Sequence, residues 1–82
     1  MNKITVNFGD LTNELKNKGL RIFIRKTNDT NMFIQDKQDN IYQIENYFGG
    51  SYLDRMINNK IHAEFIKVDK SIIKESEKDF LN

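Results

Sequence analysis

The sequence predicts an α+β domain whose sheet is mainly antiparallel. Short runs in which apolar and polar residues alternate recur along the chain, and this pattern is typical of strands with one buried face. Segments with apolar residues three or four positions apart indicate helices. The middle runs are joined by short polar turns, which favours antiparallel pairing. The predicted order is β-α-β-β-β-α-β-α, with four or five strands and two or three helices in a single compact domain over residues 1–82.

The first two elements are a strand and a helix. Apolar and polar positions alternate over residues 4–8, as in a half-buried strand. Asp10 is expected to cap a helix over residues 10–18, because its carboxylate can accept amide hydrogens of the first turn. Gly19 is expected to end that helix, since glycine adopts the left-handed conformation without strain.

Three strands are predicted next, at residues 20–25, 32–35 and 41–46. The turns between them, residues 27–31 and 36–40, are rich in Asn and Asp, whose side chains readily bond their own backbone. These features predict an antiparallel meander.

The remaining chain predicts a helix over residues 51–59, a strand over residues 62–68 and an amphipathic helix over residues 71–81. All helices are expected to pack on one face of the sheet. That face forms the predicted core, which consists of Ile4, Val6, Phe8, Leu20, Ile22, Ile24, Ile34, Tyr42, Ile44, Ile66 and Val68.

The composition bounds the class of protein. The hydrophobic content of 38% and six Phe exclude a disordered chain. The chain has no cysteine, which favours a reducing compartment. It has no basic, apolar leader and no apolar run of the length that spans a bilayer, so we expect a soluble, cytoplasmic protein without membrane contact.

Residues with catalytic chemistry are sparse. His62 is the only histidine, and without Cys or a second His it cannot complete a usual zinc site. Ser51 follows two glycines, but the flanking pattern of a nucleophile elbow is absent, and helix capping explains it better. The four glycines are too dispersed to form a phosphate-binding loop. We therefore expect a protein that is not an enzyme and that has neither metal nor cofactor.

Charge is distributed unevenly, although the net charge is only +1. Residues 1–26 carry six basic and two acidic side chains, whereas residues 27–54 carry one basic and five acidic side chains. Carboxylates spaced along a hairpin can imitate nucleic-acid phosphates and enter a basic groove of another protein. The alternative is a solvated edge whose charges prevent aggregation. The candidate residues of this acidic hairpin are Asp29, Asp36, Asp39, Glu45 and Asp54.

A second surface has the opposite charge. Basic and aromatic residues alternate on the outward side of the strand at residues 20–25 and recur in the strand at residues 62–68. Such a face can stack bases and neutralise phosphates. The alternative is that the final helix covers the rings, with the arginine stems packed alongside. The candidate residues of this basic-aromatic set are Arg21, Phe23, Arg25, Phe65 and Lys67.

The segment "GDLTNELKNKGL", followed by a strand, a polar turn, the hairpin "IQDKQDNIYQIE" and a helix, resembles small phage anti-CRISPR proteins that inhibit the effector nuclease. The resemblance implies that acidic side chains imitate DNA in the groove that reads the target's flanking motif. The matching acidic positions are Asp36, Asp39 and Glu45. The other matching residues are Asp10, Leu11, Glu14, Lys16, Asn17 and Lys18.

The sequence therefore predicts a small non-enzymatic inhibitor or adaptor, from a phage or mobile element, that binds a larger host protein through a surface including the acidic hairpin. A nucleic-acid-processing enzyme is the expected kind of partner. The alternative function is a nucleic-acid-binding or regulatory module that uses the basic-aromatic set. The chain itself is expected to be a monomer or a homodimer.

Overall fold

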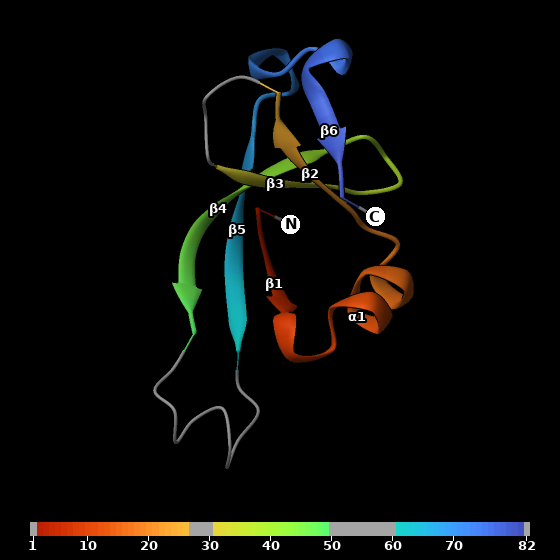
Figure 1. The fold of residues 1–82 in the computed structure, drawn as a ribbon. Helices are drawn as coiled ribbons and strands as arrows, with labels where there is room; N and C mark the ends of the chain where they lie inside the picture. Colours follow the sequence, from red (N-terminus) through yellow and green to blue (C-terminus); the bar gives the residue numbers. More distant parts are fainter. Residues whose placement is uncertain (1, 27–30, 50–60, 82) are drawn as a thin grey trace.

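A computed structural model describes residues 2–26, 31–49 and 61–81 (Figure 1). Their backbone forms a curled antiparallel sheet of six strands in the order β1-β5-β4-β3-β2-β6 and one α-helix, α1 (Leu11–Lys18). The α+β class is confirmed, and the sheet has one strand more than the upper expectation. The strands are β1 (Lys3–Asn7), β2 (Arg21–Arg25), β3 (Met32–Gln35), β4 (Ile41–Phe48), β5 (His62–Val68) and β6 (Lys78–Phe80).

Helix α1 ends as predicted but begins differently. Gly19 has a φ of 65°, and the amide of Leu20 donates to the carbonyl of Leu15 at 2.8 Å, which closes the helix. The expected cap by the Asp10 carboxylate is wrong. That carboxylate instead accepts from the side-chain amide of Asn13 at 3.2 Å, and the short 3₁₀ turn η1 (Phe8–Asp10) leads the chain into the helix.

Helix α1 also covers the outer edge of β1 (Figure 1). Lys18 donates from its Nζ to the carbonyl of Thr5 at 2.7 Å, and the amide of Asn7 donates to Oε2 of Glu14 at 2.7 Å. Glu14 and Lys18 are one turn apart and form an ion pair at 3.1 Å. These contacts occupy backbone groups that an added strand would need, so they hinder association through this edge.

The main core lies on the concave face of the curled sheet and under α1. Val6, Leu20, Ile22, Ile34 and Tyr42 are buried there, as predicted. Ile4, Phe8 and Ile44 are half-buried and pack against them. The remaining buried members are Leu15, Ala63 and Phe65.

A second core lies on the opposite face of the sheet. Its fully buried rings, Phe23 and Phe33, are stacked with centroids 5.3 Å apart, and Ile41 and Ile73 are buried beside them. Ile22 and Phe23 are therefore both buried although consecutive strand residues point to opposite faces. The expectation that only one face of the sheet is covered is wrong, because this part of the sheet is covered on both.

The predicted helix over residues 71–81 is wrong. The chain there forms the two 3₁₀ turns η3 (Lys70–Ile72) and η4 (Glu75–Glu77) and then β6, which pairs with β2. The amide of Leu81 donates to the carbonyl of Ile22 at 2.9 Å, and the amide of Lys26 donates to the carbonyl of Glu77 at 2.8 Å. Pairing with β2 satisfies backbone groups that a helix would have left unpaired at the sheet edge, and the turns cover the second core.

The predicted orientation of β5 is also wrong. Phe65 lies opposite Ile4 and Ile44 and is fully buried, whereas Ile66 lies opposite Lys3 and Gln43 and is 39% exposed. Residues opposite each other in antiparallel strands share a face, so Phe65 faces the main core and Ile66 faces away. Ile24 and Val68, also expected in the core, are half-buried.

Two further sequence predictions concern the second helix and membrane-spanning segments. The predicted helix over residues 51–59 lies outside the described residues. Within the parts of the chain that the structure describes, no helix has the length and apolar character needed to cross a bilayer.

Candidate functional site

The turn between β3 and β4 is built around Asp36. Its Oδ1 accepts from the amides of Gln38 and Asn40 at 2.9 Å each, and its Oδ2 accepts from the Asn40 side chain at 3.0 Å and the Tyr42 hydroxyl at 3.1 Å. Desolvation by burial raises the pKa of Asp36, but the hydrogen bonds from Asn40, Tyr42 and Gln38 outweigh it and hold the pKa below its ordinary value. Asp36 therefore shapes the hairpin.

Asp36→Asn is expected to lower the free energy of unfolding by about 1–3 kcal/mol at neutral pH, because the new NH₂ group faces donors. A lowered folded-state pKa stabilises the fold above the unfolded pKa of about 3.9, and that stabilisation is lost as the pH falls through the folded value. The difference between wild type and variant should thus shrink in acid. Urea denaturation across pH tests this, with exposed Asp79→Asn as control; an unchanged difference in strong acid would contradict it.

The other described acids of the hairpin lie apart from Asp36. Asp39 has a φ of 64°, is exposed and accepts from Nε2 of Gln35 at 3.1 Å. Glu45 lies at a β-bulge of β4, where Lys3 Nζ approaches its Oε2 to 3.8 Å. Asp36 lines a hollow with main-core residues, whereas Asp39 lines one with second-core residues. The structure does not gather the three acids, and Asp29 and Asp54 lie outside the described residues.

No element in the described part of the chain covers one region of the sheet. The second core continues along a cross-strand row, in the order Lys3, Ile66, Gln43, Phe33, Phe23 and Phe80. Phe23 and Phe33 are covered by the C-terminal segment, but Ile66 on β5 is exposed. We call the uncovered part of this face the outer β-face; its residues are Lys3, Glu45, Phe48, His62, Glu64 and Ile66.

The outer β-face combines apolar and acidic side chains. Phe48 is 44% exposed, and its ring stacks on the ring of His62 with centroids 4.7 Å apart. Lys3 lies between two carboxylates, with its Nζ 3.4 Å from Glu64 and 3.8 Å from Glu45. Among the described acids of the predicted hairpin, Glu45 thus lies on this face.

The basic-aromatic set does not form a stacking surface. Phe23 and Phe65 are both fully buried and belong to different cores, so neither ring is open to a base. The Arg21 guanidinium lies 3.6 Å from the centre of the Phe80 ring, and Arg25 also packs on an aromatic ring of the second core. Lys67 is exposed on β5. The expected covering helix is wrong as well: the turns before β6 cover Phe23, and the main core encloses Phe65.

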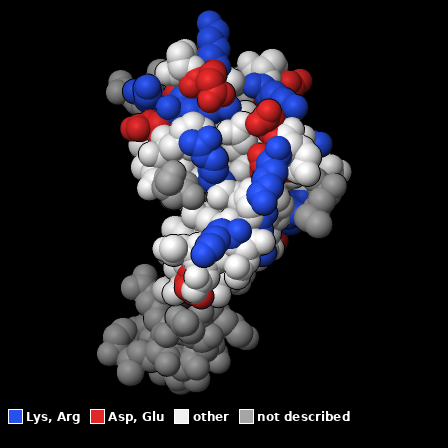
Figure 2. Space-filling model, turned by 90° about the vertical axis from the view of Figure 1, so that its right-hand side faces the viewer, with Lys and Arg blue, Asp and Glu red and all other residues white. Residues whose placement is uncertain are grey.

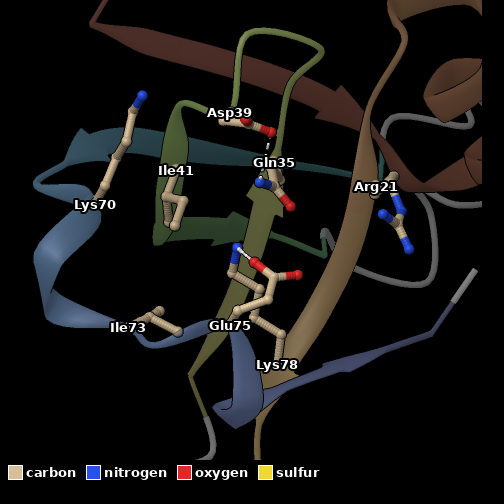
Figure 3. A pocket seen from close by; sticks show the side chains of 8 residues that line it. All are labelled: Arg21, Gln35, Asp39, Ile41, Lys70, Ile73, Glu75 and Lys78. Atoms are coloured by element: carbon tan, nitrogen blue, oxygen red, sulfur yellow. Dashed lines mark hydrogen bonds and ion pairs between the residues drawn. The ribbon is translucent and has the colours of Figure 1, made fainter.

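A polar hollow of about 480 Å³ was missed by the sequence reasoning (Figure 3). Its floor is the cross-strand row Arg21, Gln35 and Ile41, and Figure 3 shows Lys78 and Glu75 meeting at its centre. We call it the C-terminal pocket. No sequence signal marked it, because most of its remaining lining comes from the C-terminal segment, where turns and β6 replace the predicted helix. Its lining residues are Arg21, Gln35, Asp39, Ile41, Lys70, Ile73, Glu75 and Lys78.

Charges of both signs are interleaved on the side of the molecule that carries α1 and β6. Figure 2 shows Lys and Arg side chains spread along this side with Asp and Glu among them, mostly in its upper half. Over the described ranges 2–26, 31–49 and 61–81, no three His, Cys, Asp or Glu side chains are grouped to hold a metal ion.

Comparison with known proteins adds no relative: the chain matches no family model, no curated protein and no solved structure.

Proposed function

We propose that the chain is a non-enzymatic binding protein, a small inhibitor or adaptor that meets a larger protein through the outer β-face. The observation that carries the proposal is the exposure of apolar side chains on the part of the sheet that no described element covers. The same face that is covered over Phe23 and Phe33 is open at Ile66 and Phe48, which are 39% and 44% exposed. Ile66 and Phe48 lie on the same face with the pair of Asn46 and Glu64 between them, and apolar side chains exposed on an open sheet face are candidates for an interaction site.

The chemistry of the outer β-face suits a protein partner. Protein interfaces combine apolar and polar side chains, and the outer β-face offers both: Ile66 and Phe48 are apolar, Glu64 lies between them along β5, and Glu45 lies at the bulge. The two carboxylates accelerate association with a basic surface and make the association rate sensitive to salt. Asp36 contributes by holding the turn in shape.

A narrower form of the proposal names the partner as a nucleic-acid-processing enzyme of the host, in particular a guided effector nuclease. It is supported by the resemblance of residues 9–20 and of the hairpin to small phage anti-CRISPR proteins. In that case the chain lowers the rate at which the guide-loaded nuclease cleaves its target DNA.

Site-specific photo-crosslinking tests the general proposal. A photoreactive phenylalanine analogue is placed at Ile66 or, as a matched control, at Ile72, which is 41% exposed on the C-terminal segment and is not part of the outer β-face. In an extract of the native host, the probe at Ile66 should crosslink to one discrete larger protein that the probe at Ile72 does not capture. Identical products from both positions, or no discrete product at Ile66, would contradict the proposal.

A further inference from the structure

The C-terminal pocket contains a buried lysine whose charge is paired with the carboxylate of an exposed side chain. The Lys78 side chain is only 5% exposed, and its Nζ lies 2.7 Å from Oε2 of Glu75 and 5.7 Å from the centre of the Phe23 ring. A buried ammonium group is costly unless a carboxylate or another acceptor pairs with it. The carboxylate seen here belongs to a side chain that is 78% exposed, on the short turn η4.

The two side chains of this ion pair differ in exposure and therefore in conformational freedom. Lys78 is fixed by burial in β6, whereas Glu75 reaches the ammonium group from the rim and is surrounded by solvent on its other sides. An exposed side chain can leave an ion pair at small cost, provided that another anion takes its place. The Lys78 ammonium group would then stay paired with the new anion, while the Glu75 side chain rotates out of the pocket into solvent.

The rest of the pocket also favours an anion. Lys70 and Arg21 line it together with Lys78, so that three cationic side chains face two carboxylates while Glu75 is inside. Arg21 is held in place by its contact with the Phe80 ring. The hydrogen bond and charge of Lys78, followed by the charge of Arg21, hold the pKa of Glu75 below its ordinary value despite some desolvation.

We infer that the C-terminal pocket is a binding site for a carboxylate group, and that Glu75 is the internal carboxylate which a ligand displaces from Lys78. The ligand class follows from the group that now occupies the site. A hollow of about 480 Å³ accommodates a small carboxylic acid or the acidic side chain of a peptide. The site lies on a covered part of the sheet and does not depend on the outer β-face.

The test is a titration followed by NMR of the Lys78 side chain and the amides of residues 75–78, at constant ionic strength. The probes are acetate, succinate and an end-capped acidic peptide, which distinguish a free acid from a peptide side chain. Saturable shifts centred on Lys78 are expected with at least one of these probes. Glu75→Gln should tighten binding about tenfold or more, because the internal competitor then no longer occupies the site.

The matched control is Glu77→Gln, which removes the same charge from the same turn at a residue outside the pocket lining. It should change the affinity by less than about threefold, because Glu77 is half-buried outside the pocket lining and would not touch the ligand. Lys78→Gln should abolish binding; if that variant does not fold, the comparison between positions 75 and 77 still decides.

Three results would overturn the inference. They are the absence of saturable shifts with every carboxylate in the Glu75→Gln variant, an equal effect of the substitutions at positions 75 and 77, and tighter binding of inorganic phosphate than of any carboxylate. Ile66→Asp should leave the titration unchanged, so that failure of the outer β-face and failure of this pocket are separate outcomes.

Discussion

Phe65→Ala is expected to lower the free energy of unfolding by about 3–5 kcal/mol, whereas Ile66→Ala lowers it by less than about 1 kcal/mol. Phe65 is fully buried in the main core, and its ring centre lies 6.4 Å from that of Phe8. Its removal leaves a cavity among residues that come from several strands. Ile66 is 39% exposed on the outer β-face, so its truncation leaves no enclosed cavity.

Urea denaturation of the two variants measures this difference. The comparison is sharp because the residues are adjacent in β5 and both changes remove a large apolar side chain. Equal losses, or a larger loss for Ile66→Ala, would show that the opposite face of β5 is inward.

Ile73→Asp is expected to cost more than about 3 kcal/mol, because it places a carboxylate in an apolar core. Ile73 is 5% exposed and packs in the second core with Phe23 and Phe33. The substitution should lift the C-terminal segment from the sheet and open β2 to solvent at its pairing with β6. Since small domains are stable by about 5–15 kcal/mol, the loss is a large part of the total.

The neighbouring substitution Ile72→Asp is the control, since Ile72 is 41% exposed. It should cost little, and hydrogen exchange at the β2 amides should accelerate only in the Ile73→Asp variant. Equal stability of the two variants would contradict the placement of Ile73, and with it the assignment of the C-terminal segment as the cover of the second core.

The elements that the sequence predicted well are those specified by neighbouring residues. The left-handed Gly19 ends α1 where the sequence places it, and β3 and β5 have the predicted bounds. In each case a local signal, such as a cap glycine or a two-residue alternation, agrees with the final structure.

The wrong predictions concern elements whose structure depends on contacts with residues far away in the sequence. The segment after residue 69 has apolar residues at spacings that suit a helix. In the structure it instead pairs with the edge of β2 and buries the rings of Phe23 and Phe33. The orientation of β5 depends on which residues of β1 and β4 lie opposite Phe65. Neither the open edge nor the register is visible in a single segment.

In the candidate sites, too, the sequence identified individual residues but not the contacts that they make in the fold. The sequence identified Glu45 as a surface acid, and Glu45 lies at the bulge on the outer β-face. It could not show that Asp36 is engaged in four hydrogen bonds within its own hairpin, three from the turn and one from Tyr42 of β4. The C-terminal pocket joins β2, β3 and the turn η4, so no sequence window contains it.

The most direct test of the account is the affinity of the partner found by crosslinking for two variants, Ile66→Asp and Ile72→Asp. The two side chains have nearly equal exposure, and only Ile66 lies on the outer β-face. Ile66→Asp should weaken binding by about 2 kcal/mol or more, roughly 30-fold, as expected at the centre of an interface, while Ile72→Asp stays near wild type. Equal affinities of the two variants would contradict binding through the outer β-face.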